Sequence, residues 1–122
     1  MKYVILMQVD PAVLESLTEE QQHTIQSGHG DFMDATKASG EFVATNALAD
    51  PSRSKVIRSK GGVPEVTDGP FVEAKEFMGG YYLIDVENEE RAIELAKLIP
   101  DSTIDGLALE IRQVMFFDGG DM

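Results

Sequence analysis

Apolar residues along this chain change spacing in an order that alternates between strands and helices. A short apolar run within residues 3–9 occupies both parities, which predicts a first strand buried on both faces until Asp10-Pro11 ends it. Further strands are expected over 41–48 and 80–86. Residues 107–112 alternate apolar and polar side chains with a period of two, and 115–117 are expected to extend that strand.

Two segments between these strands have the pattern typical of helices. Thr18-Glu19-Glu20-Gln21 matches a capping box, so a helix is predicted from about residue 19 to residue 39, with Gly40 ending it. Asn88 caps a second predicted helix, whose apolar positions recur at helical spacing until Pro100 stops it. Asp10 and Pro11 predict a short capped turn before the first of these helices.

The order of these elements predicts one domain, residues 1–122, of the α+β class. Residues 55–59 and 63–67 predict a hairpin around Lys60-Gly61-Gly62, inserted between two β-α-β halves. Two helices on one face of an antiparallel sheet give a ferredoxin-like sandwich. The other face would expose Tyr81 and Leu83, so we expect a face-to-face homodimer.

The first predicted helix carries a histidine between two glycines. Ile25, His29, Phe32 and Thr36 fall on one helical face, so His29 is expected to point inward or along the edge of the buried stripe. Each glycine costs about 1 kcal/mol relative to alanine within a helix. Gly28 and Gly30 therefore indicate either tight packing or room for a ligand, or else a helix weakened or broken near residues 27–28 with His29 incidental.

A turn motif precedes the strand at 80–86. In Asp68-Gly69-Pro70, the aspartate can bond its own backbone, the glycine permits positive φ and the proline fixes φ near −65°. One interpretation is an anchored loop, with Phe71 packed onto the core.

The second interpretation of the same segment is functional. Asp68 with Glu73 or Glu76 would line a pocket beside Gly79-Gly80. Two adjacent glycines at a strand entrance indicate a bulge or a close approach to the backbone.

Charge and composition narrow the classes of partner. The 122 residues carry a net charge of −12 and no cysteine, which excludes disulfides, thiolate metal sites and cysteine nucleophiles. Such a chain repels phosphate backbones and anionic lipids, so neither direct nucleic-acid binding nor membrane association is expected. The basic residues at 53, 55, 58 and 60 are interpreted as a solvated face of the hairpin.

The features that the sequence lacks predict where the protein is found and whether it holds a cofactor. The opening apolar run is too short for a membrane span and is not followed by a cleavage site, so a cytoplasmic protein is expected. His23 and His29 are six residues apart, off one helical face, and no phosphate-binding glycine loop occurs. No metal and no cofactor are expected.

The segment 68–76, followed by 79–86, resembles the signature of the DGPF branch of the YCII-related proteins. The similarity continues through residues 92–94, Ile99-Pro100 and 110–114, and covers essentially the whole chain. This resemblance implies a ferredoxin-like domain that pairs as a dimeric α/β barrel. It also implies a bacterial protein of a family often encoded beside, or fused to, extracytoplasmic-function sigma factors, and without a generally established activity.

The wider group implies a site made of a histidine from the first helix and an aspartate near the end of the second. His29 matches the histidine by its distance from Gly40. The aspartate–proline pair of the group is Ile99-Pro100 here, and Asp101 follows the proline, so this chain departs from the pattern at that point.

Three hypotheses for function remain open. In the first, the chain is a small-molecule enzyme in which His29 is a general acid or base, oriented by Asp68 by preference or by Asp101. Tyr82, on the helix-facing side of its strand, would donate a hydrogen bond to a developing oxyanion. In the second, His29 only packs, and the chain is a ligand-binding or regulatory module linked to a sigma factor. In the third, the hairpin and the acidic face serve assembly alone.

Overall fold

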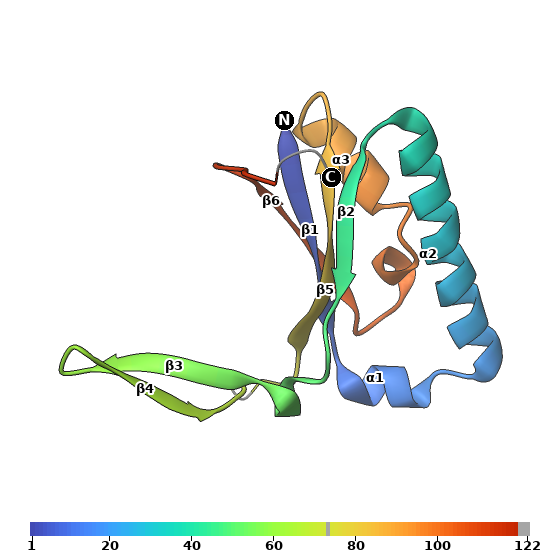
Figure 1. Ribbon diagram of the computed structural model, residues 1–122. Helices are drawn as coiled ribbons and strands as arrows, with labels where there is room; N and C mark the ends of the chain where they lie inside the picture. The colour runs from blue at the N-terminus through green and yellow to red at the C-terminus, as the bar shows by residue number, and fades with distance from the viewer. Residues whose placement is uncertain (73, 120–122) are drawn as a thin grey trace.

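The computed structural model describes residues 1–72 and 74–119, and Figure 1 shows a sheet with helices packed on one of its faces. The elements follow the order β1 (Lys2–Val9), α1 (Pro11–Ser16), α2 (Glu19–Ser39), β2 (Phe42–Ala47), η1 (Pro51–Arg53), β3 (Lys55–Lys60), β4 (Val63–Asp68), β5 (Phe77–Asp85), α3 (Glu89–Ala96), η2 (Pro100–Thr103) and β6 (Ala108–Gln113). Strands β2-β5-β1-β6 form an antiparallel sheet, while β3 and β4 form a separate two-stranded sheet. This topology confirms the predicted ferredoxin-like α+β fold with an inserted hairpin.

Local sequence signals set the ends of α2. Thr18 Oγ1 accepts a hydrogen bond from the backbone N–H of Gln21, and the Gln21 side chain accepts one from the N–H of Thr18. Gly40 ends the helix in the left-handed conformation at φ 80°. The helix is continuous across Gly28 and Gly30, so the interpretation of a broken helix was wrong.

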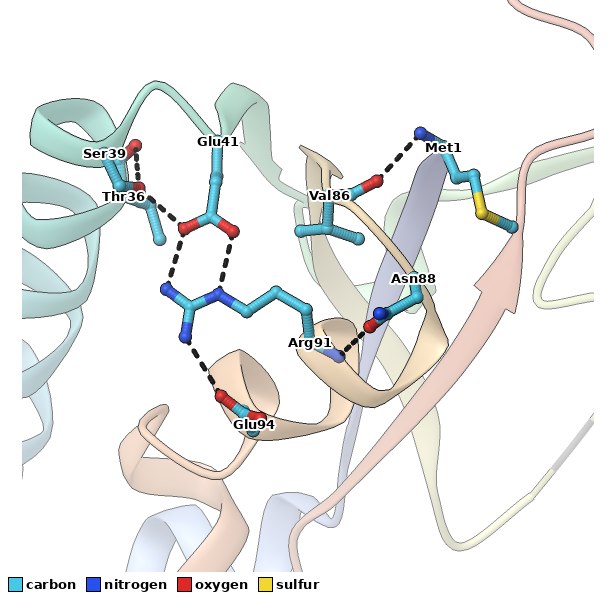
Figure 2. Close-up of polar contacts among 8 residues, drawn as sticks. All are labelled: Met1, Thr36, Ser39, Glu41, Val86, Asn88, Arg91 and Glu94. Carbon is cyan, nitrogen blue, oxygen red and sulfur yellow. Dashed lines mark hydrogen bonds and ion pairs between the residues drawn. The ribbon is translucent and has the colours of Figure 1, made fainter.

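The start of α3 is joined to the end of α2 by a two-point ion pair, drawn in Figure 2. The Arg91 guanidinium donates from Nε and Nη2 to the two carboxylate oxygens of Glu41, each at 2.9 Å. These hydrogen bonds hold the pKa of Glu41 below its ordinary value. Asn88 accepts a bond from the Arg91 backbone N–H, which caps the same helix end.

The core lies between the helices and one face of the sheet. Ile5 and Ile84 are fully buried there against Leu95 and Phe32. Residues of the opposite sheet face, including Val4 and Leu6, are only half-buried in the single chain. The prediction that the first strand is buried on both faces therefore holds for one face of this chain, because both long helices lie on the same side (Figure 1).

Two boundaries differ from the predicted ones. Helix α3 ends at Ala96, since the amides of Leu98 and Ile99 bond to carbonyls three residues earlier and tighten the last turn. Strand β6 ends at Gln113, and Met115 lies fully in solvent, so the expected extension over 115–117 was wrong.

Candidate functional site

Three side chains from three different elements form one hydrogen-bonded chain. His29 on α2 contacts the Tyr82 hydroxyl of β5 through Nδ1 at 2.7 Å and Asp101 Oδ1 of η2 through Nε2 at 2.8 Å. The His29 and Tyr82 rings are also stacked, with centroids 5.8 Å apart. His29 therefore points inward, as predicted, and Tyr82 faces the helix, as predicted.

A close contact between α2 and η2 brings His29 and Asp101 together. A Cβ atom added to Gly28 would lie 2.3 Å from Pro100 Cγ, so only glycine allows the helix to approach this closely. Pro100 begins η2, and Asp101 follows it with its side chain directed at the next residue of α2. Gly30 has no neighbour within 4 Å of such a Cβ, so tight packing explains Gly28 alone.

The hydrogen-bond partners define the proton positions of a neutral His29. An ionised Asp101 only accepts, so His29 Nε2 carries the proton that it donates to Oδ1. Nδ1 is then an acceptor, and the Tyr82 hydroxyl donates to it. The resulting direction of donation runs from Tyr82 to His29 to Asp101, and a proton added to the imidazole would place a positive charge next to the Asp101 carboxylate.

Burial sets the electrostatics of this group. The His29 and Asp101 side chains are 21% and 8% exposed, and Tyr82 belongs to the core. Burial, and secondarily the charge of Asp101, raises the pKa of Tyr82 to about 12. Tyr82 is therefore a protonated hydrogen-bond donor at neutral pH.

A cavity of about 330 Å³ adjoins these three residues between α2 and the sheet. Its remaining lining is mostly apolar, with a threonine and an asparagine from β2: Met7, Val9, Met33, Thr45, Asn46, Ala47 and Gly79. A second hollow beside α1 and α2 also reaches His29 and Met33. An apolar cavity with a few convergent polar groups is the usual form of a small-molecule site.

The glycine pair predicted to mark a bulge or a close approach does both. Gly79 lies where the β1–β5 register shifts, since Met7 pairs with Gly80 and Gln8 with Met78. A Cβ on Gly80 would lie 2.6 Å from the carbonyl oxygen of Asn46. A Cβ on Gly79, which lines the cavity, would lie 2.8 Å from Val9 Cγ2, so both glycines are required by close packing.

Asp68 does not join this cluster in the described chain. It ends β4 and pairs with Lys55, with 83% of its side chain exposed. The carboxylate beside His29 is therefore Asp101, the second choice of the sequence prediction. Glu76 is exposed and absent from the cavity lining, and Glu73 lies outside the described residues.

The rest of the turn motif also differs from its predicted structure. Phe71 does not pack onto the core, because the turn leaves the body with the hairpin. Its ring lies instead beneath the Arg58 guanidinium, 4.4 Å from centroid to Cζ. Gly69 has no positive φ; a Cβ there would lie 2.7 Å from the Cβ of Ser54, so close packing explains this glycine.

Residues 1–72 and 74–119 lack two kinds of feature. Within these ranges no three histidine or carboxylate side chains gather as metal ligands would. None of the helices in the same ranges combines the length and the apolar character that crossing a bilayer demands.

Comparisons with known proteins agree with the architecture. The family model described as the YCII-related domain matches residues 1–118. An uncharacterised protein of Rhizobium meliloti (strain 1021) is 23% identical over 122 residues, which cover 100% of this chain and 98% of that protein.

Proposed function

Since the chain belongs to the YCII-related domain family, we propose that it is a small-molecule enzyme in which His29 is the general acid or base. The observation that carries this proposal is the continuous hydrogen-bonded chain from Tyr82 through His29 to Asp101 at the wall of a cavity. A partly buried histidine held by a carboxylate is the arrangement expected of a proton-transfer group.

We assign a role to each residue of this hydrogen-bonded chain. Asp101 holds the Nε2–H tautomer and stabilises the imidazolium that forms when Nδ1 takes a proton. His29 and Tyr82 both line the cavity and are bonded to one another through Nδ1, and we assign the Tyr82 hydroxyl as the group that meets a bound compound. When Tyr82 accepts a proton from that compound, its own proton passes to Nδ1, and no free phenolate forms.

The supported reaction class is proton transfer on a small carbonyl or cyclic compound. Loss of a proton beside a carbonyl places negative charge on the carbonyl oxygen, which a hydrogen-bond donor stabilises. Thr45 and Asn46 belong to the same lining, but Thr45 Oγ1 donates to the Tyr81 carbonyl and Asn46 Nδ2 to the Tyr81 hydroxyl, so they reach a bound compound only by exchanging these bonds. The apolar side chains opposite them favour the carbon skeleton of the compound.

The test is hydrogen–deuterium exchange of small carbonyl and cyclic compounds in D₂O, followed by proton NMR with the purified protein. His29→Gln and Asp101→Asn are expected to lower the exchange rate by about 10²- to 10⁴-fold. Asp68→Asn is the matched control, since its carboxylate pairs with Lys55 on the hairpin, and it is expected to retain the wild-type rate.

A nitrogen-15 spectrum of the imidazole gives a second readout that needs no substrate. Neutral His29 is expected to be protonated on Nε2 and unprotonated on Nδ1, and Tyr82→Phe is expected to shift the Nδ1 signal. Full exchange activity in His29→Gln would exclude the catalytic role. Binding of a compound without turnover, unchanged in that variant, would favour the ligand-binding module instead.

A further inference from the structure

The second hollow, between α1 and α2, has no part in the proton transfer proposed above. Its volume is about 460 Å³, and α1 lies at the end of the molecule where α2 begins (Figure 1). Two glutamines and His29 are the polar part of its lining, and the apolar part is Leu14, Leu17, Ile25 and Met33. Leu14 is 41% exposed, and no residue of α1 is buried. The described part of the chain therefore leaves an apolar surface uncovered inside a concave space.

The α1 side of this hollow is held in place by contacts with the rest of the molecule. Asp10 caps the helix, accepting a hydrogen bond from its first turn through Oδ1. A Cβ on Gly106 would lie 2.3 Å from Val13 Cγ2, so Val13 packs directly against the backbone at Gly106. Val13 thus anchors α1, while its neighbour Leu14 lines the hollow.

The hollow is continuous with the cavity beside Tyr82. His29 and Met33 line both spaces, and because they are four residues apart they lie on one face of α2. Ile25 precedes His29 by four residues on the same face, so the row from Ile25 to Met33 extends about 12 Å along the helix axis. A compound whose reacting group meets the Tyr82 hydroxyl can therefore extend past His29 and Met33 into the hollow.

The charges around the two spaces favour an uncharged compound. Among the described residues, neither lining includes a lysine or an arginine, and the one carboxylate, Asp101, is bonded to His29. Lys75 pairs at 3.5 Å with Asp10, beside the cavity residue Val9. A carboxylate or phosphate on the compound would meet no basic side chain of these linings, in a chain of net charge −12.

We propose that the substrate is an uncharged carbonyl compound with an apolar tail, which places its carbonyl group in the cavity and its tail in the hollow between α1 and α2. The position of the carbonyl group rests on the proposed function. The position of the tail rests on the shared lining and on the apolar side chains that the tail would remove from water. Leu14 and Ile25 are then specificity-determining residues, because they contact the tail and not the reacting atoms.

A series of methyl ketones from butanone to decanone tests this proposal through binding, which needs no turnover. Carbon-13 methyl spectra of the protein measure the affinity and show which leucine and isoleucine methyl groups respond. Affinity is expected to rise about two- to fourfold with each added methylene group. The methyl signals of Leu14 and Ile25 are expected to shift with the longer ketones and not with butanone. Octanoate, which carries a carboxylate on a similar tail, is expected to bind at least tenfold more weakly than octanone.

Two variants locate the tail. Leu14→Gln and Ile25→Gln are each expected to reduce the gain in affinity per methylene group, and the exposure of Leu14 means that the first substitution leaves the core intact. Leu98→Gln is the matched control, because Leu98 is 62% exposed and outside both linings, and it is expected to retain the wild-type gain. Affinity that is independent of tail length, or that rises equally in all four proteins, would overturn the proposal.

The exchange assay in D₂O separates this proposal from the proposed function. Exchange of butanone without any effect of tail length would support the enzyme and overturn the tail site. An affinity that rises with tail length in the wild type and not in Leu14→Gln, without exchange of any ketone, would support the tail site and exclude the enzyme.

Discussion

Gly28→Ala tests whether the contact between α2 and η2 determines the geometry of the site. The new Cβ would lie 2.3 Å from Pro100 Cγ, whereas carbon atoms pack at about 3.5–4.0 Å, so η2 has to move by about 1 Å or more. A proline ring carbon cannot rotate away as a flexible side chain does. The movement carries Asp101, the next residue, away from His29.

Gly30→Ala is the reference variant for the change in unfolding free energy that Gly28→Ala causes. Both substitutions gain about 1 kcal/mol of helix propensity, but only the alanine at 28 meets a neighbour, since nothing lies within 4 Å of a Cβ at 30. The difference in unfolding free energy between the two variants therefore isolates the cost of overpacking, about 1–3 kcal/mol. Gly30→Ala is expected to be more stable than the wild type, and Gly28→Ala less stable than Gly30→Ala by that amount.

Urea unfolding followed by circular dichroism measures this difference, and the imidazole nitrogen-15 signals report on the His29–Asp101 bond. Gly28→Ala is expected to change the Nε2 signal, while Gly30→Ala leaves it as in the wild type. Equal stability of the two variants, with unchanged imidazole signals in both, would refute the claim that this contact sets the position of Asp101.

Two further predictions concern pH. Burial raises the pKa of Tyr82 to about 12, so the unfolded chain loses the phenolic proton at a lower pH than the folded chain does. The wild type should therefore lose on the order of 2 kcal/mol of unfolding free energy between pH 10 and 12, whereas Tyr82→Phe should not. Urea unfolding at each pH measures this difference. A parallel decline in both proteins would contradict the assigned burial. Hydrogen bonds from Arg91 lower the pKa of Glu41, so the stability that the ionised carboxylate contributes is present above the unfolded value near 4.5 and is lost as the pH falls. Glu41→Gln should therefore lower the unfolding free energy by up to about 1 kcal/mol at pH 7, and the difference from the wild type should disappear below pH 4.5. Equal stability of the two proteins at pH 7 would show that the ion pair is only a surface contact.

Local signals predicted the parts of the fold that depend on neighbours in sequence. The capping box at Thr18 and the stop at Gly40 set the bounds of α2 because the atoms involved are within a few residues of one another. The hairpin register follows from the Gly61-Gly62 turn for the same reason. The inward orientation of His29 also followed from helical periodicity alone.

The partner of His29 was harder to predict because it depends on the docking of two distant elements. Asp101 is 72 residues from His29 in sequence, and no periodicity joins them. The available signals were the unexplained glycine at 28 and the proline at 100, which become informative only as a pair. Asp68 was predicted as the partner of His29 because it belongs to a turn with a distinctive sequence. The turn residues do not determine that the hairpin points away from the body, where Asp68 pairs with Lys55 instead.

The departure of this chain from the aspartate–proline order that the family resemblance implied has a structural explanation. Ile99, which precedes the proline here, is fully buried in the core, where an ionised carboxylate would lack a partner. Asp101 lies one position after the proline, in the 3₁₀ turn, and reaches the imidazole at 2.8 Å. An exchange of the two side chains, Ile99→Asp with Asp101→Ile, should therefore destabilise the fold without restoring the His29 Nε2 signal; a folded double variant with that signal intact would show that either position can supply the carboxylate.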